Sequence, residues 1–395
     1  MWQRIKNIYH LLVAFFFNCI FLFPGKSINV IGVTGTDGKT TTANLIYHIL
    51  KTAGKNVSLI SSVGAIVNNK GYDLENHVTT PSSFILQKFL RRAVSQKSEY
   101  FVIEVTSHSI DQHRIWGIPF KIGVLTNITP EHLDYHKTFD AYVSTKIKLL
   151  NLSQKVIANI DDSSYTFLGD VKNKKNIKNW ITYGFHKSAE INIDDYNYES
   201  KYLVGDFNKY NMLAGIASAK ALGLTDEEIK KGVAGFKPPI GRFDIVYSGS
   251  FSVMIDFAHT PNAFANLLSS LKPIVKGRII HVFGSAGERD AHKRPFMGEI
   301  SSKYSEIIVL TSEDPRSEDP NKIAEEIVSG IKNNKCQVFK IIERQKAVEA
   351  AIQMAKDGDM VLITGKAHEK SMNYGKGEEP WDEYNAVESA LKKRK

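Results

Sequence analysis

A loop that could hold a nucleotide runs from Thr34 to Thr40, with the sequence Thr-Gly-Thr-Asp-Gly-Lys-Thr. Glycines let the backbone come close to a ligand, so that successive N–H groups and the start of a following helix can surround a polyphosphate. Lys39 would neutralise the β- and γ-phosphates, and the Thr40 hydroxyl would coordinate Mg²⁺. The first glycine of the usual pattern falls at Val33, which leaves a plain glycine turn before a helix as the alternative. We expect a nucleoside-triphosphate site here.

The segments around this loop have the pattern of a parallel sheet covered by helices. Residues 28–33 (INVIGV) form an apolar run typical of a buried strand, and residues 40–53 place apolar side chains at helical spacing. Strand, loop and helix in this order are the opening unit of a parallel α/β sheet. Further strands are predicted at residues 57–60, 100–105, 122–126 and 155–159, and a long helix at residues 208–222.

The pattern restarts after Pro238-Pro239 and Gly241, which mark a joint between domains. Five more strands, separated by helices, are predicted at residues 253–257, 279–283, 307–310, 338–342 and 360–364. The fold class is therefore α/β. We predict a hydrophobic N-terminal helix (1–25), a P-loop parallel-sheet ATPase domain (26–239) and a Rossmann-like doubly wound C-terminal domain (240–395).

Composition narrows the classes of function. The chain has 395 residues, 43% of them hydrophobic and 24% charged, which suits two or three domains and excludes disordered and fibrous proteins. The net charge of +9 fits an acidic or phosphorylated partner. Because no aromatic or recognition motif accompanies the basic residues, we expect no nucleic-acid partner. Cys19 and Cys336, the only cysteines, cannot build a disulfide framework and favour a reducing compartment.

An apolar run covers residues 8–23 and follows the basic residues Arg4 and Lys6. As a helix these 16 residues would be roughly 24 Å long, and about 20 residues are needed to span a bilayer comfortably. No small-residue cleavage site follows it, as a secretory signal would require. Because an ATP site comes soon after, we expect a cytoplasmic protein whose helix lies at the inner face of the cell membrane. A helix docked on the protein's own surface is the second interpretation, and a true span is the third.

Six motifs occur in order within residues 28–390 and together resemble the Mur ligases, in particular the members that add the third peptide residue in peptidoglycan synthesis. The motifs are TGTDGKTTT (34–42), EVTSHSIDQHR (104–114), TNITPEHLDYH (126–136), Gly241-Arg242, DFAHTPN (256–262) and GKAHE (365–369). A spaced set of motifs is far more specific than any one of them.

The resemblance implies an ATP-dependent amide-bond ligase that uses Mg²⁺. Members turn a peptide carboxylate into an acyl phosphate, which the amine of an amino acid then attacks, and ADP and phosphate leave. Since the carboxylate and the γ-phosphate repel one another, such a site must supply concentrated positive charge. Two departures stand out: Asp37 replaces the usual asparagine, and the apolar run stands where related members carry a uridine-binding domain.

The resemblance also assigns site residues. Those expected to bind ATP are Gly35, Thr36, Asp37, Gly38, Lys39, Thr40, Thr41, Asn127, Asn208, Asn211, Arg242, Asp256 and His259. Those expected to hold Mg²⁺ are Thr40, Glu104, His132 and Lys146, and those expected to be catalytic are Lys39, Glu104, His132 and Lys146. Those expected to contact the muramoyl-peptide precursor or the amino acid are Thr79, Thr80, Pro81, Ser82, Thr106, Arg114, Arg294, Asp314, Arg316, Gly365 and Glu369.

Several of these assignments have simpler alternatives. Lys146 matches the lysine that members carbamylate with CO₂, but it could equally be an exposed helix lysine, as Lys148 could. Asn208 and Asn211 could cap the helix that follows them. The spacing of His132 and His136 resembles a zinc pair, yet the glutamate of a metalloprotease is missing and no further ligand is evident.

The amino acid to be added is indicated by Glu313-Asp314-Pro315-Arg316, which follows a predicted strand. Members that add diaminopimelate have Asp-Asn-Pro-Arg there. Arg316 could hold the distal carboxylate of diaminopimelate through two parallel hydrogen bonds, and lysine lacks that group. Diaminopimelate is therefore favoured over lysine, although Asp314 in place of asparagine removes an amide donor.

Two other functions stay open. One is a related ligase with a lipid-linked or polyglutamate-type acceptor, and the Glu313 to Arg316 segment argues against the polyglutamate type. The other is a non-catalytic member that needs a partner protein, but such members usually carry a cysteine zinc ribbon that two cysteines cannot build.

Overall fold

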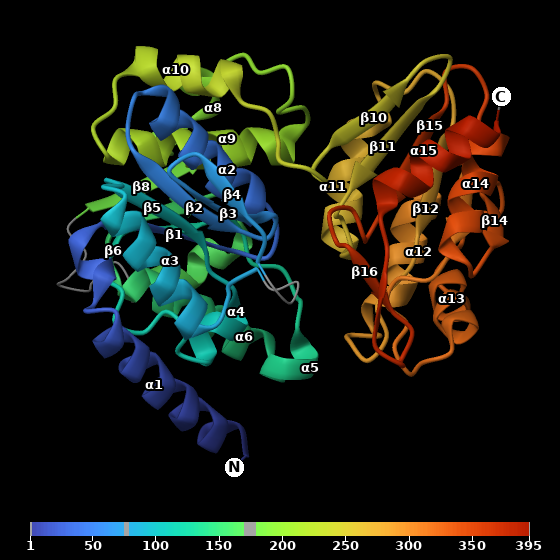
Figure 1. Cartoon of the computed structure of the whole chain (residues 1–395). Coiled ribbons are helices and arrows are strands. Elements are labelled where there is room, and N and C mark those ends of the chain that lie inside the picture. Colours follow the sequence, from blue (N-terminus) through green and yellow to red (C-terminus); the bar gives the residue numbers. More distant parts are fainter. Residues whose placement is uncertain (1, 75–78, 170–178, 395) are drawn as a thin grey trace. The chain divides into compact units, whose positions relative to one another are not determined.

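The computed structural model describes residues 2–74, 79–169 and 179–394 (Figure 1). The chain divides into two compact units, Met1–Pro238 and Pro239–Lys395. Each unit has its own sheet with helices on both faces, so the predicted α/β class with mainly parallel sheets is confirmed.

The first unit is built on a nine-stranded sheet with the order β4-β3-β2-β5-β1-β6-β7-β8-β9. Its strands are β1 (Asn29–Thr34), β2 (Val57–Ser61), β3 (Gly64–Val67), β4 (Lys70–Tyr72), β5 (Tyr100–Glu104), β6 (Phe120–Leu125), β7 (Ser153–Asn159), β8 (Asn179–Gly184) and β9 (Ile191–Asn192). Neighbours from β2 to β9 are parallel, whereas β3 and β4 pair antiparallel. The central strands are buried on both faces, which explains their continuous apolar sequences.

Helices cover both faces of this sheet. The helices of the first unit are α1 (Trp2–Ile20), α2 (Lys39–Thr52), α3 (Ser83–Ser95), α4 (Ser107–Asp111), α5 (Leu133–His136), α6 (Phe139–Asn151), α8 (Ile193–Tyr196), α9 (Asp206–Ala221) and α10 (Asp226–Gly235), with 3₁₀ turns at Pro24–Ser27 and Ser163–Leu168. α2, α9 and α10 bury one face in a shared apolar cluster, and α3 and α6 cover the other face. The phosphate loop lies between the end of β1 and the start of α2, at the carboxyl edge of the sheet.

The second unit has a six-stranded sheet with the order β10-β11-β15-β12-β13-β14, in which only β10 is antiparallel. Its strands are β10 (Asp244–Ser248), β11 (Ser252–Asp256), β12 (Ile279–Phe283), β13 (Ile307–Leu310), β14 (Gln337–Lys340) and β15 (Met360–Thr364), and a separate hairpin pairs β16 (Ser371–Asn373) with β17 (Glu378–Pro380). Its helices are α11 (Pro261–Leu271), α12 (Lys293–Tyr304), α13 (Pro320–Val328), α14 (Arg344–Met354) and α15 (Glu383–Lys393). α11, α12 and α13 pack on one face, and α14 and α15 pack on the other.

The N-terminal helix differs from the predicted apolar run. It begins at Trp2 and ends at Ile20, because Leu22 and Phe23 turn into the left-handed region (φ 59° and 49°) before Pro24. Within residues 2–74, 79–169 and 179–394, no helix is both long enough and apolar enough to cross a membrane.

A buried histidine in the second unit predicts how stability depends on pH. His281 on β12 has no exposed surface, and its ring nitrogens lie 2.8 Å from the Ser301 hydroxyl and 3.0 Å from the Thr364 hydroxyl. Burial lowers its pKa from 6.5 to about 3. Between these values the unfolded chain binds a proton that the folded chain does not, so stability falls as the pH drops below 6.5. We expect this residue to make the free energy of unfolding about 2 kcal/mol lower at pH 5 than at pH 7.

The test is the free energy of unfolding of wild-type protein and His281→Asn at several pH values. Asparagine keeps a polar side chain but cannot be protonated, so the variant should lose stability less steeply below pH 6.5. His186→Asn, at an exposed histidine, is the control and should keep the wild-type slope. Equal slopes in wild type and His281→Asn would contradict the assignment.

Candidate active site

The phosphate loop has the backbone of an anion cradle. Gly38 precedes α2 with φ 80°, and a β-carbon there would lie 2.2 Å from Asn211 Oδ1. Gly35 has φ 152°, and a β-carbon would lie 1.8 Å from Thr126 Oγ1. Both positions therefore need glycine. The first turn of α2 contains no acidic residue and its N-cap has no side-chain hydrogen bond, which suits a bound polyphosphate.

Residues that follow β6 hold this loop in shape. Asn127 Oδ1 accepts from the Asp37 backbone N–H at 2.9 Å, and its Nδ2 donates to the Asp37 carbonyl at 3.2 Å. Thr126 Oγ1 donates to the same carbonyl at 2.7 Å. The Thr36 hydroxyl accepts from the Thr129 N–H at 3.0 Å and lies 3.1 Å from the Tyr142 hydroxyl. Asn127 thus lies beside the phosphate loop.

Oxygen atoms suited to Mg²⁺ converge at the start of α2. The Thr40 hydroxyl donates to Glu104 Oε2 at 3.1 Å, and Glu104, at the end of β5, is fully buried. Ser62 donates to the same carboxylate through its N–H at 2.9 Å and its hydroxyl at 3.0 Å. Hard cations prefer such carboxylate and hydroxyl oxygens, so Thr40 and Glu104 fit Mg²⁺. Lys39 lies next to them, and its Nζ donates to the Thr36 carbonyl at 2.6 Å.

Lys146 points from α6 into the interior beneath the phosphate loop. It is 2% exposed, and its Nζ donates to the Gly35 carbonyl at 2.6 Å and lies 4.5 Å from the centroid of the Tyr142 ring. Burial, with a further contribution from Lys39, holds the pKa of Lys146 well below its usual range. The alternative of an exposed helix lysine does not apply to Lys146 but does apply to Lys148.

Three histidines lie close together: His108 on α4, and His132 and His136 after β6. The ring centroids of His132 and His136 lie 4.9 Å and 5.6 Å from that of His108. Burial lowers the pKa of His132 to about 4, although Glu131 Oε2 is 3.6 Å from its Nε2. His132 is therefore neutral near pH 7 and able to donate a lone pair to a metal. His136 Nε2 lies 2.9 Å from the Ser107 hydroxyl, and burial lowers its pKa to about 4 as well.

A metal cluster of the zinc type is not found in the part of the chain that the structure describes: no group of three or more histidine, cysteine, aspartate or glutamate side chains could hold an ion there.

The residues expected to contact the precursor surround the carboxyl end of β5. Thr80 Oγ1 donates to the Glu104 carbonyl at 2.9 Å and accepts from the Thr106 N–H at 3.0 Å. Arg114 Nη1 donates to the Thr80 carbonyl at 2.7 Å. The Ser82 hydroxyl caps α3, and Thr79 and Pro81 flank Thr80. This group therefore lies directly beside the proposed Mg²⁺ ligands.

Asn208 and Asn211 are brought together on α9. Asn211 Nδ2 donates to Asn208 Oδ1 at 3.3 Å, and Asn211 Oδ1 accepts from the Thr42 hydroxyl at 3.2 Å. Neither residue is the N-cap, which is Gly205. Asn211 thus reaches the phosphate loop, whereas Thr41 is a buried first-turn residue of α2.

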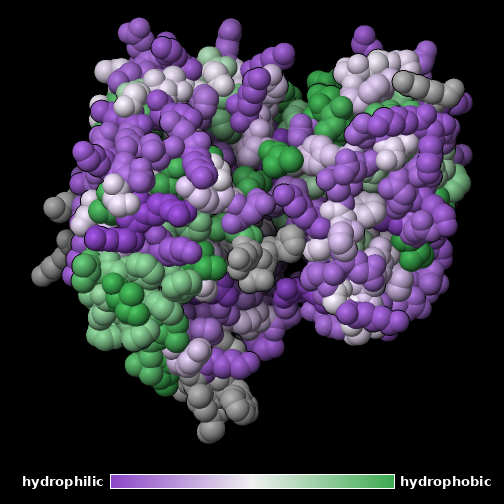
Figure 2. All heavy atoms as spheres, viewed as in Figure 1, coloured by the Kyte–Doolittle hydropathy of each residue, from purple (hydrophilic) through white to green (hydrophobic). Residues whose placement is uncertain are grey.

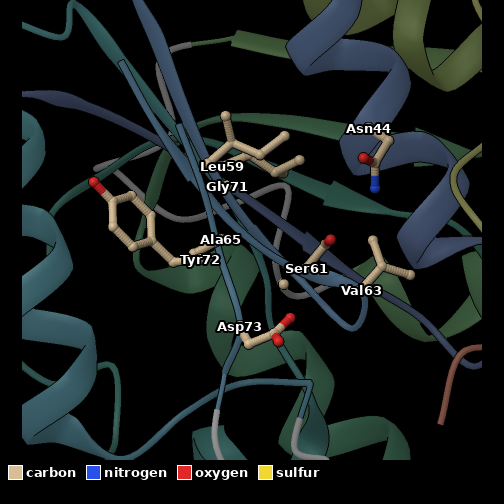
Figure 3. Close-up of a pocket in the computed structure, with 10 residues that line it drawn as sticks. Asn44, Leu59, Ser61, Val63, Ala65, Gly71, Tyr72 and Asp73 are labelled. Carbon is tan, nitrogen blue, oxygen red and sulfur yellow. The ribbon is translucent and has the colours of Figure 1, made fainter. Parts of the chain in front are cut away.

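A pocket lies between α2 and the β2-β3-β4 edge of the sheet (Figure 3). Asn44 lines it from α2, while Ser61 and Asp73 line it from the strands and the segment after them. Asn44 Nδ2 donates to the Thr40 carbonyl at 2.8 Å, so the pocket adjoins the first turn of α2.

In the second unit, Arg242, Asp256 and His259 lie close together. Asp256 ends β11, and its carboxylate accepts from the Phe243 and Ala258 N–H groups, both at 2.7 Å. The Arg242 guanidinium lies 4.6 Å from the centroid of the Phe257 ring. Burial raises the pKa of Asp256 despite the nearby Arg242.

A second group follows β13 and β15. Lys366 is buried and pairs with Asp314 at 3.0 Å and Glu369 at 2.6 Å. Gly365 (φ 101°) has no room for a side chain, because a β-carbon would lie 2.1 Å from Glu313 Oε2. The carboxylate of Glu369 is thus neutralised by the buried ammonium group of Lys366.

The two arginines expected near the amino acid contact one loop. Arg316 Nη1 donates to the Gly287 carbonyl, and Arg294 Nη2 donates to the Ala286 carbonyl at 3.2 Å. Arg294 is 1% exposed and its Nη1 pairs with Glu318 at 2.8 Å and Glu326 at 2.6 Å.

Sequence reasoning missed residues that complete these groups. Ser62 orients Glu104, Tyr142 contacts the phosphate loop and Lys366 joins Asp314 to Glu369. Lys366 stands inside the GKAHE motif, so its position was a signal. Ser62 and Tyr142 have none, because serine and tyrosine are common at such positions for structural reasons.

Comparisons with known proteins bear on this geometry. A model of the Mur ligase middle domain matches residues 33–219, and a model of the Mur ligase, glutamate ligase domain, matches residues 241–367. The chain belongs to the Mur ligase family. It is accordingly a ligase that forms carbon–nitrogen bonds, and the family uses ATP and Mg²⁺.

Relatives of this Mur ligase include proteins with curated names. UDP-N-acetylmuramoyl-L-alanyl-D-glutamate--2,6-diaminopimelate ligase of Clostridium botulinum is 35% identical over 93% of this chain and 79% of its own length. The ligase of the same name from Aquifex aeolicus is 38% identical over 93% of this chain and 78% of its own length.

Solved structures agree on the fold. A structure of a ligase of that name matches with a TM-score of 0.61 and 26% identity, over 93% of this chain and 79% of its own. A folylpolyglutamate synthase of Mycobacterium tuberculosis matches with a TM-score of 0.72 over 91% of this chain and 96% of its own, but at 15% identity it supports the fold alone.

Proposed function

We propose that this Mur ligase adds an amino acid, meso-diaminopimelate, to a UDP-N-acetylmuramoyl-dipeptide precursor in peptidoglycan biosynthesis. The reaction joins the amine to a carboxylate activated as an acyl phosphate, with ATP converted to ADP and phosphate. The relatives named above act, by their names, on this precursor and this amino acid. The observation that carries the proposal is the cluster of Lys39, Thr40, Glu104 and Lys146 around one glycine-rich loop.

In this proposal the chain itself supplies the charge that phosphoryl transfer needs. The α2 N-terminus and Lys39 would hold the β- and γ-phosphates, and Thr40 and Glu104 would hold one Mg²⁺, which would neutralise charge on the phosphates. His132 is a candidate ligand of a second Mg²⁺. Asn211, Asn208, Arg242, Asp256 and His259 are the proposed contacts of the rest of ATP.

Lys146 is proposed to react with CO₂. Its neutral amine attacks the carbon of CO₂, a C–N bond forms, and one proton is released to leave a carbamate anion. The change turns a potential cation into an oxygen ligand for metal. The low pKa of Lys146 supports this step, because only the unprotonated amine is nucleophilic.

The precursor and amino-acid contacts follow from the two side-chain groups described above. Thr80, Thr106 and Arg114, with Thr79, Pro81 and Ser82, are proposed to contact the peptide end of the precursor. Arg294, Asp314, Arg316, Gly365 and Glu369 are proposed to contact the amino acid, with Arg316 on its distal carboxylate. We place the enzyme in the cytoplasm, at the inner face of the cell membrane.

Replacing Arg316 with alanine should raise KM for diaminopimelate by about 10- to 100-fold, because a charge-assisted hydrogen-bonded pair with the distal carboxylate is lost. KM for ATP should be unchanged. Activity with lysine, which has no distal carboxylate, should change much less. Arg289→Ala, at an exposed arginine nearby in the chain, is the control. Equal losses of activity with both amino acids would show that Arg316 does not bind the distal carboxylate.

The deciding experiment incubates purified protein with Mg²⁺, ATP, bicarbonate and UDP-N-acetylmuramoyl-L-Ala-D-Glu, with diaminopimelate or lysine, and measures product mass and released phosphate. A diaminopimelate tripeptide supports the proposal. A product with lysine alone would correct the amino acid. If neither amino acid is joined, the acceptor is wrong, and lipid-linked and polyglutamate-type acceptors are tested next.

A further inference from the structure

One side of the N-terminal helix contacts the rest of the first unit. Asn18 Nδ2 donates to the Trp116 carbonyl at 2.8 Å, and Asn18 is 1% exposed. The ring of Phe17 lies 4.9 Å from that of Phe84 on α3, and Phe15 lies 5.6 Å from Trp116. Asn7 Nδ2 donates to Asp111 at 3.0 Å near the other end. α1 is therefore held in a defined orientation.

The opposite side of α1 is apolar and exposed. Its large apolar side chains Ile8, Tyr9, Leu12, Phe16 and Ile20 are from 53% to 64% exposed, and Leu22 just after the helix is 71% exposed. Their spacing of three, four and seven residues keeps those of α1 on one side of the helix. Figure 2 shows the hydrophobic patch over α1, at the lower left of the view. Soluble proteins rarely leave so many neighbouring large apolar side chains in water, so this side of α1 fits an apolar partner.

The charged side chains of residues 2–30 and of α3 all have one sign. Residues 2–30 and α3 contain no aspartate or glutamate, and their exposed lysines and arginines are Lys6, Lys26, Lys88, Arg91 and Arg92. Lys26 Nζ lies 4.7 Å from the centroid of the Phe23 ring, and Lys88 Nζ lies 6.0 Å from that of Phe84. Basic groups next to aromatic rings are the features of a segment that lies in the headgroup region of an anionic bilayer.

We propose that α1 lies parallel to the membrane surface, with Leu12 and Phe16 inserted among the lipid chains and Lys26 and Lys88 against anionic headgroups. The inference rests on the membrane location in the proposed function and adds the contact residues and the lipid class. A second copy of the chain fits this side less well. Two identical faces would bring their positive charges together with no carboxylate from α1 or α3 to pair with them.

The test is co-sedimentation of the full chain with lipid vesicles at physiological salt. One set contains phosphatidylcholine alone, and the other has about a third of its lipid replaced by phosphatidylglycerol. We expect at least about tenfold stronger partitioning into the anionic vesicles, reduced by added salt. Equal binding to both sets would overturn the anionic preference, and no binding to either would overturn the membrane contact.

Matched variants separate the apolar from the charged contribution. Phe16→Asp should lower binding to anionic vesicles by at least about tenfold, because a carboxylate then replaces an inserted ring. Phe296→Asp in the second unit is its control, since Phe296 is 57% exposed and Phe16 is 58% exposed. Lys26→Glu with Lys88→Glu should remove the preference for anionic lipid, and Lys187→Glu with Lys332→Glu, at exposed lysines, should not.

Two further measurements make the result specific. Circular dichroism of Phe16→Asp should match wild type, and its ligation of soluble substrates in the absence of lipid should be unchanged, so failure of membrane binding is distinguishable from failure of the proposed reaction. Light scattering after gel filtration reports the oligomeric state without lipid. If wild type is a dimer that Phe16→Asp dissociates, a second copy covers α1 and the membrane proposal is wrong.

Discussion

Lys146→Ala is expected to lower kcat for amide-bond formation by about 10³-fold or more, comparable with the loss of a group that stabilises a charged transition state. Alanine removes the amine that is proposed to take up CO₂, and with it the carboxylate that would support metal next to the γ-phosphate. The side chain is buried and donates to the Gly35 carbonyl at 2.6 Å, so no exposed lysine can replace it.

Lys148→Ala is the matched control, because this lysine lies on the same helix but is exposed. It should keep wild-type kcat. The carbamate itself can be observed as a ¹³C resonance after incubation with labelled bicarbonate, present in wild type and Lys148→Ala and absent from Lys146→Ala. Unchanged ligation by Lys146→Ala would show that no carbamate at this residue is needed.

Glu104→Gln is expected to lower kcat by about 10²- to 10³-fold and to raise the Mg²⁺ concentration needed for half-maximal rate. Glutamine keeps an oxygen that can accept from the Ser62 N–H, now at 2.9 Å from Glu104, so the fold should hold. It lacks the negative charge that attracts a divalent cation to Thr40.

The measurement is a Mg²⁺ titration of the ligation rate at saturating ATP. Glu99→Gln, at an exposed glutamate just before β5, is the control and should leave the titration unchanged. A variant whose kcat falls without any shift in the Mg²⁺ requirement would indicate that Glu104 shapes the loop through Ser62 and does not hold the metal.

Much of the fold was predictable because the buried parallel strands are continuous apolar runs. The predicted strands at 279–283, 307–310 and 360–364 coincide with β12, β13 and β15. The β3-β4 hairpin was missed. Its strands have only four and three residues. Every second residue of β3 is buried, and no residue of β4 is. The two strands are joined by a turn in which Asn68 and Asn69 adopt positive φ. Such short strands form only when the neighbouring edge of β2 is already in place.

The types and order of the chemical groups could be derived from local sequence alone. A glycine loop between a strand and a helix predicts a phosphate cradle wherever the rest of the chain lies, since backbone geometry is local. Likewise a carboxylate at the end of a parallel strand, here Glu104, faces the edge where ligands bind.

Burial and partners could not be derived in this way, because they depend on contacts between segments far apart in the chain. Lys146 and Lys148 are two residues apart on one helix, and packing against the phosphate loop buries the first and leaves the second in water. The partners of Lys366 are likewise set by the approach of the segments after β13 and β15. Desolvation and charge pairing are properties of the assembled fold, so the pKa values and roles of these side chains follow from it.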